Sequence, residues 1–188
     1  KVQLDLAKLQ VRLTDLEFDT DLGKIAIAEV QQQFPQLAAA GLERLEGKIS
    51  AHCPTALVSS QGLEKLELNV LLTNGLVALK SLPKPVSDIS AKVKGAETQV
   101  ELSEFLARIG TGNIKAKALV ADYLKTPRYT FEIEGDNILM EEVAPTLAPN
   151  TQTSGKASFA LKGEGQIKPG VDPFSQLTAQ GGVQAENL

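Results

Sequence analysis

The chain has 188 residues, with 23 acidic and 19 basic side chains and a net charge of −4. This acidic balance, with only 4% aromatic residues, argues against a nucleic-acid-binding protein, since such proteins present basic surfaces and stacking side chains. The length is that of one domain able to bury a core. The single cysteine, Cys53, excludes an intrachain disulfide.

The first third of the chain predicts a strand region followed by short helices. Apolar residues alternate from Val2, then change phase after Leu6, which predicts a β-bulge near Ala7. A helical pattern runs from Ala28 to Leu45, and Pro35 and Gly41 interrupt it. Because proline and glycine break helices, we expect two short pieces.

From Leu66 onward, apolar and polar residues alternate in six segments, which predicts strands. An Asn74–Gly75 pair predicts a hairpin turn, and Asp136–Asn137 predicts another turn. Single-turn helices are expected near residues 103–109 and 141–147. The six predicted strands are 66–72, 88–94, 114–120, 129–133, 157–161 and 177–185.

One spacing of apolar residues occurs three times, at relative positions 1, 3, 6 and 10 with a glutamate at 5, and a weaker fourth copy begins at Val77. A strand that begins with glycine follows each of the three copies. The repeated glutamates, Glu29, Glu104 and Glu142, are each expected at a helix start, where a negative charge is favourable. Internal repeats indicate a chain built by stacking, with function on a continuous surface.

Each predicted strand has one apolar and one polar face, which indicates an antiparallel, one-sided sheet. About nine strands spaced ~4.8 Å apart span roughly 40 Å. Covering that face would need about four helices of ~10 Å diameter, and the sequence supplies about one. We therefore expect a mainly β fold, a single elongated domain over residues 1–188, whose sheet curls over its apolar face as a groove, taco or sandwich, with a few short helices.

Catalytic chemistry finds little support in the sequence. His52 and Cys53 are neighbours on a predicted strand, so their side chains should point to opposite faces. Gly163–Glu164–Gly165 lacks the rest of a nucleotide loop and favours a bulge or strand bend. We therefore predict a non-enzymatic protein with no catalytic residue, no metal and no cofactor.

The remaining candidate is the apolar face. Two interpretations are open: an ordinary core whose residues only pack, or a face that stays partly open and binds an apolar ligand. Small residues on this face fit both close packing and room for a ligand. The candidate groove residues are Leu68, Val70, Leu72, Ile89, Val93, Ile114, Ala116, Ala118, Tyr129, Phe131, Ile133, Ala157, Phe159 and Leu161.

Residues 66–188 resemble the AsmA-like superfamily of bacterial envelope proteins, including its TamB branch, through the order of four segments: LNVLLTNGLVAL, ISAKVKGAETQVELSEFLARIGTGNIKAKALV, TPRYTFEIEGDNILMEEV and SGKASFALKGEGQ. The resemblance implies a fragment of a longer, repeat-built protein of outer membrane biogenesis. Such a protein is anchored to the inner membrane outside this fragment and crosses the periplasm.

The resemblance also implies an apolar β-groove for lipid transport, with phospholipids or other acyl chains as ligands and flanking repeats of the same chain as neighbours. The helical insert between Val30 and Gly47 departs from that pattern and is expected to cap one end. Two alternatives remain: a closed-core structural or protein-interaction module of an envelope assembly factor, or a noncatalytic domain of a larger enzyme.

Overall fold

The structure, a computed structural model, describes residues 1–5, 9–147, 154–168 and 173–186. Ten strands form one antiparallel sheet in sequence order. They are β1 (Val2–Asp5), β2 (Gln10–Asp21), β3 (Leu42–Ser59), β4 (Gly62–Leu79), β5 (Val86–Gly95), β6 (Gln99–Ile109), β7 (Gly112–Ala121), β8 (Arg128–Leu139), β9 (Lys156–Gln166) and β10 (Thr178–Glu186). The helical segments are η1 (Leu22–Lys24), α1 (Ile27–Gln33), α2 (Pro35–Ala39), α3 (Met140–Leu147) and η2 (Pro173–Gln176).

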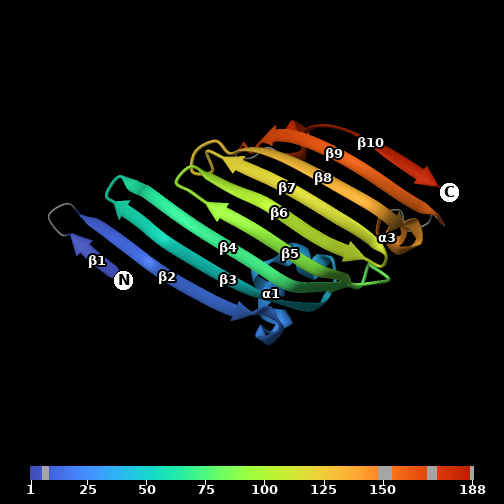
Figure 1. Ribbon diagram of the computed structural model, residues 1–188, viewed down its shortest axis with the longest axis horizontal. Coiled ribbons are helices and arrows are strands. Elements are labelled where there is room, and N and C mark those ends of the chain that lie inside the picture. The colour runs from blue at the N-terminus through green and yellow to red at the C-terminus, as the bar shows by residue number, and fades with distance from the viewer. Residues whose placement is uncertain (6–8, 148–153, 169–172, 187–188) are drawn as a thin grey trace.

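The sheet is open, because β1 and β10 form its two edges and do not pair with each other (Figure 1). The helices α1 and α3 lie beside strand ends (Figure 1). All six strands predicted from the alternation are present, as parts of β4, β5, β7, β8, β9 and β10. The mainly β, antiparallel fold class is therefore confirmed, whereas the curl into a groove stays a prediction.

Direct cross-strand pairing places the apolar residues on one face of the sheet. One row of paired residues crosses nine strands from β2 to β10: Phe18, Ala51, Val70, Val93, Leu102, Ala118, Phe131, Gly163 and Ala179. A parallel row consists of Thr20, Ile49, Leu72, Ala91, Phe105, Ala116, Ile133, Leu161 and Gly181. Because paired residues in an antiparallel sheet share a face, apolar side chains follow one another across almost the whole sheet.

Both predicted turns are wrong, because each lies inside a strand. Asn74–Gly75 belongs to β4 and Asp136–Asn137 to β8, and the pairing shifts register at each place. Asn74 and Asn137 have φ values of 53° and 54°. Asparagine tolerates this left-handed backbone, which is required in hairpin turns and also occurs in bulges. The asparagine residues therefore predicted the left-handed backbone correctly, but they did not show that it belongs to a bulge within a strand rather than to a turn.

The helix expected at residues 103–109 is also wrong, because β6 runs through this segment. Phe105 pairs with Ala116 and Ala107 with Ile114, after a register shift that follows Leu102. Apolar residues four apart fit a helix and, equally, every second position of a strand. Residues 103–109 form a strand because they pair with both β5 and β7.

The phase change near the N-terminus marks a reversal of chain direction, since β1 and β2 pair as antiparallel neighbours. Ala7 itself lies outside the described residues. Leu4 pairs with Val11, and Val2 with Leu13. The apolar residues of β1 therefore lie on the same face of the sheet as those of β2, and the predicted bulge near Ala7 stays a prediction.

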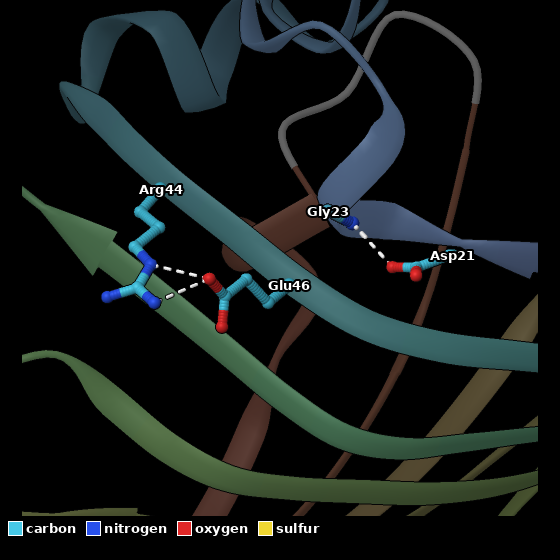
Figure 2. Close-up of polar contacts among 4 residues, drawn as sticks. All are labelled: Asp21, Gly23, Arg44 and Glu46. Atoms are coloured by element: carbon cyan, nitrogen blue, oxygen red, sulfur yellow. Dashed lines mark hydrogen bonds and ion pairs between the residues drawn. The ribbon is translucent and has the colours of Figure 1, made fainter.

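Two helical pieces are confirmed as α1 and α2, separated at Pro35, but the helical pattern expected to reach Leu45 is wrong at its end, because β3 begins at Leu42. Before them, the Asp21 carboxylate accepts a hydrogen bond of 3.0 Å from the Gly23 backbone N–H and caps η1 (Figure 2). Arg44 and Glu46, two residues apart on one strand, form an ion pair near the start of β3 (Figure 2). The Gln31 amide donates to the Leu42 carbonyl at 2.9 Å. Of these contacts, the Gln31–Leu42 hydrogen bond joins α1 to the first residue of β3.

Aromatic rings lie over glycines on the apolar face. A Cβ on Gly135 would overlap the Phe159 ring, one on Gly163 would lie 2.5 Å from the Phe131 ring, and one on Gly165 would overlap Tyr129. Pairing of β8 with β9 continues without a shift through Gly163 and Gly165. This regular pairing excludes the bulge expected at Gly163–Gly165, whereas the strand bend named beside it stays a prediction. Close ring packing accounts for these glycines.

We predict that Gly135→Ala destabilises the domain by about 1–3 kcal/mol, because the added methyl group forces the Phe159 ring away. Gly95→Ala is the matched control, since a Cβ there would meet the Leu68 Cβ at 3.3 Å. Urea unfolding monitored by circular dichroism measures both. Equal losses of stability in the two variants would contradict the ring-packing explanation.

Candidate functional site

The structure brings all fourteen candidate groove residues together on the apolar face. Eight of them lie in the two rows that cross the sheet, and Leu68 lies two positions before Val70 on β4 and pairs with Gly95. Tyr129 pairs with Val120, Ile114 with Ala107, Phe159 with Val183, and Ala157 with Ile138. Ile89 pairs with Gly75 and lies two positions before Ala91 on the same strand. The candidate site is therefore one continuous surface rather than a cleft formed by distant loops.

This face is not a closed core within the described part of the chain. No large side chain there is less than 2% exposed. Of the fourteen candidates, Ile89 and Ala157 are buried, Leu161 is exposed, and the others are partly exposed. The total accessible surface is 12308 Å², whereas a compact protein of 20.0 kDa exposes about 8,700 Å². A single-layer sheet without a covering layer explains the excess.

Exposure of the apolar face is greatest toward the two edges of the sheet. Phe18 is 60% exposed, and Val183 at the other edge is 69% exposed. In the middle, neighbouring strands on both sides shield each side chain. At the edges this shielding is missing on one side, so the largest uncovered apolar groups lie there.

Several residues of this face were missed by sequence reasoning. Phe105 and Ala107 were assigned to a helical turn, although their alternation with Glu104 and Leu106 was visible, and Leu102 was not named as a candidate. Phe18 and Ala51 lie in β2 and β3, whose length the sequence pattern did not reveal. The alternation of Leu16, Phe18 and Thr20 was the signal that could have placed β2 in the sheet.

Two hollows lie on the opposite, polar face. One, of about 730 Å³, is lined by side chains such as Lys117, Glu132, Lys162 and Gln180. The other, of about 590 Å³, includes Glu17, Asp19, His52, Asn69 and Lys94. These side chains pair with one another across strands and alternate with the apolar rows. The concavity expected on the apolar side thus stays a prediction.

Cross-strand ion pairs organise the polar face. Lys162 contacts Glu132 at 2.8 Å, and Lys92 contacts Glu104 at 2.9 Å. The hydrogen bond and the charge of Lys162 lower the pKa of Glu132, and the same pair raises the pKa of Lys162. Both groups are exposed, so water screens the pair and its contribution to stability is small. This face is the solvated side of the sheet.

The three repeated glutamates have different surroundings. Glu29 is exposed in the first turn of α1, and Glu142 lies in the first turn of α3. Glu104 lies within β6, so its predicted position at a helix start is wrong. Glu142 is 3% exposed, its Oε1 is 2.5 Å from Lys84 Nζ, and its Oε2 has no hydrogen-bond partner.

Glu142 also packs against a tight turn. Its carboxylate lies over Gly110, whose φ is 56°, and leaves no room for a side chain there. Gly110 joins β6 to β7, so the Glu142–Lys84 pair links α3, the segment before β5 and the β6–β7 turn.

His52 and Cys53 point to opposite faces, as predicted. His52 pairs with Glu17 on the polar side, and Cys53 pairs with Leu16 on the apolar side. Among the described residues, no group of three or more His, Cys, Asp and Glu side chains is arranged to hold a metal ion. Within that same part of the chain, no helix has the length and apolar character needed to cross a membrane.

No protein-family model, curated protein or solved structure gives a significant match to this chain.

We predict that Lys84→Met destabilises the domain by about 1–3 kcal/mol, because it leaves the buried Glu142 carboxylate without its cation. Adding Glu142→Gln should recover part of this loss, since a neutral amide is less costly to bury than an unpaired charge. Urea unfolding of both single variants and the double variant measures the coupling. Additive losses would show that the two side chains do not interact.

A second prediction concerns pH. Lys162→Met should raise the pKa of Glu132 toward its ordinary value, and Lys117→Met should raise it less, because Lys117 acts only as a weaker charge. Since the folded-state pKa of Glu132 is lowered, its stabilising contribution is present above the unfolded pKa and is lost as pH falls through the folded pKa. Carboxyl NMR titration at low and high salt measures these values. An unchanged Glu132 titration in Lys162→Met would refute the assignment.

Proposed function

We propose that this chain is a non-enzymatic segment of a lipid-binding or lipid-conducting scaffold in a bacterial envelope, and that acyl chains occupy its apolar sheet face. The single observation that carries the proposal is the apolar surface that follows cross-strand pairs from β2 to β10 without a covering layer in the described residues. Exposed apolar surface of this extent marks an interaction site.

The chemistry of the face fits acyl chains better than a polar ligand. Its rows contain Val, Leu, Ile, Phe and Ala, and the charged side chains lie on the other side. A lipid tail has no hydrogen-bonding groups, so it needs only apolar contact. Small side chains such as Ala91, Ala116 and Ala118 alternate with larger ones along the rows. Burial of each additional methylene group stabilises a complex by about 0.8 kcal/mol.

The resemblance of residues 66–188 to the AsmA-like superfamily supports the same proposal. On this view the sheet curls into an apolar groove and lies in the periplasm, and a segment outside this chain anchors it to the inner membrane. Flanking repeats would extend the groove. The helices α1 and α2 at one end of the sheet fit the expected cap, and they then limit passage of lipid at that end.

The alternative proposal is a structural or protein-interaction module, in which a protein partner covers the same apolar face. The exposure of Phe18 and Val183 suits either occupant. The two proposals predict different effects of a charge placed on the apolar face. If lipid occupies the face, the variant should co-purify with less lipid. If a protein partner covers it, the variant should no longer form the protein complex.

We predict that Ala116→Asp folds but loses bound lipid. Ala116 is partly exposed and lies between Phe105 and Ile133, so a carboxylate there can still reach water while it repels acyl chains. Gln99→Asp, which adds the same charge at an exposed position of the polar side, is the matched control. Thermal unfolding and mass spectrometry of co-purified lipid measure the two effects.

Wild type and Gln99→Asp should carry equal amounts of lipid. A wild type that carries no lipid, together with an Ala116→Asp variant that unfolds, rejects the lipid proposal in favour of a closed structural module. A buried, unpaired carboxylate in such a module would cost several kcal/mol, roughly the stability of a small domain.

A further inference from the structure

The two ends of the strands differ in what borders them. Because consecutive strands are antiparallel neighbours, β2, β4, β6 and β8 end on the side of the sheet where β3, β5, β7 and β9 begin. This side, the helix end, carries α1, α2 and α3, and Figure 1 shows α1 and α3 beside the strand ends there. The opposite side, the loop end, carries the β5–β6 loop (96–98) and the β7–β8 loop (122–127). Both ends are bounded by connections within the chain itself, so their difference does not depend on what lies beside β1 or β10.

Apolar side chains are covered at the helix end and uncovered at the loop end. The strand-end residues that are buried at the helix end are Leu42, Ile109, Ile138 and Ala157. At the loop end, Leu124 is 64% exposed, and Val58 and Ile167 are exposed as well. Ala56, which is buried near the loop end, and Phe34, which is exposed between α1 and α2, are exceptions. An apolar ligand can therefore approach the sheet from the loop end, whereas the apolar surface at the helix end is already covered.

Positive charge gathers at the loop end of β7, β8 and β9. Lys125 lies in the β7–β8 loop, Arg128 begins β8, and Lys168 follows β9. All three side chains are exposed. The only acidic residue in segments 122–128 and 167–168 is Asp122, whose carboxylate pairs with Arg128 at 2.6 Å. In a chain with a net charge of −4, this basic cluster attracts an anionic group to the loop end.

Hydrogen bonds hold the β7–β8 loop in place on both sides. The Tyr123 hydroxyl donates to the Ala96 carbonyl in the β5–β6 loop at 3.0 Å. The Ile167 backbone N–H donates to the Pro127 carbonyl at 2.8 Å, which keeps Lys168 next to the same loop. The backbone that carries the basic cluster is therefore already ordered, and less entropy is lost when an anionic group binds it.

We propose that the ligand is a lipid with an anionic headgroup, and that it enters at the loop end and lies along the strands. This inference rests on the function proposed above. The headgroup, a carboxylate or a phosphate, lies beside Lys125, Arg128 and Lys168, because such groups pair with basic side chains. The tail points toward the helix end along the apolar face. From Tyr129 to Gly135 on β8, the sheet spans about 20 Å, which exceeds the ~15 Å that a tail occupies in half a bilayer.

Tryptophan fluorescence tests the orientation, because the chain has no tryptophan of its own. Tyr129→Trp places a reporter at the loop end. Phe159→Trp places one toward the helix end, where Phe159 pairs with Gly135. The probes are two fatty acids, one with bromine beside the carboxyl group and one with bromine at the terminal methyl group, since bromine quenches a tryptophan that it contacts. We expect the first probe to quench Tyr129→Trp more strongly and the second to quench Phe159→Trp more strongly.

The outcomes separate this inference from the proposed function. Equal quenching of both variants by both probes, or the reverse order, would overturn the orientation while lipid binding itself stands. Absence of quenching by either probe in either variant would overturn the proposed function and this inference with it. Circular dichroism checks that both aromatic replacements keep the sheet.

Charge reversal tests the headgroup without any tryptophan. Lys125→Glu combined with Lys168→Glu should weaken binding of palmitic acid at least about fivefold at low salt, and should leave binding of its uncharged methyl ester unchanged. Lys24→Glu combined with Lys156→Glu, two exposed lysines at the helix end, is the matched control and should change neither. Equilibrium dialysis below the micelle concentration measures the affinities. Equal weakening by the two double variants, or equal weakening for the acid and the ester, would overturn the headgroup assignment.

Discussion

Ten antiparallel strands must keep their apolar side chains on the same face, and every other property of this protein depends on that constraint. Side chains alternate with a period of two, so an unpaired extra residue would turn the rest of a strand over. The left-handed residues Asn74, Asp88 and Asn137 lie at register shifts in β4, β5 and β8. At these places the strand absorbs an extra residue, and the apolar rows continue in phase to β10.

The sheet therefore presents a continuous apolar surface, and no second layer covers that surface in the described part of the chain. Burial of apolar surface stabilises proteins by about 2.5 kcal/mol for each 100 Å². An apolar face that spans nine strands could therefore contribute a large favourable free energy if a ligand or partner buried it. Cross-strand packing, such as aromatic rings over glycines, recovers part of it. Binding of acyl chains, or of a protein partner, would recover more, which is why the uncovered face is the candidate site.

The alternation of apolar and polar residues was sufficient to predict the antiparallel sheet and to place all fourteen candidate residues on one face. It was insufficient where one local pattern serves two structures. Asn74–Gly75 favours a left-handed backbone, and only the pairing of β4 with β3 and β5 makes this a bulge rather than a turn. Residues 103–109 fit a helix or a strand, and pairing with distant residues decided between them. Strand ends, bulges and the register of pairing depend on contacts that are far apart in sequence.

The central claim is that acyl chains touch the apolar face, and photo-crosslinking tests it most directly. Benzoylphenylalanine placed at Phe131 lies on the apolar face, and the same group placed at the adjacent Thr130 lies on the polar face. After irradiation in bacterial cells, mass spectrometry of the purified chain identifies what was attached. We predict lipid adducts at position 131 and none at position 130. Adducts at position 131 that contain only protein, or equal lipid labelling at both positions, would contradict the account.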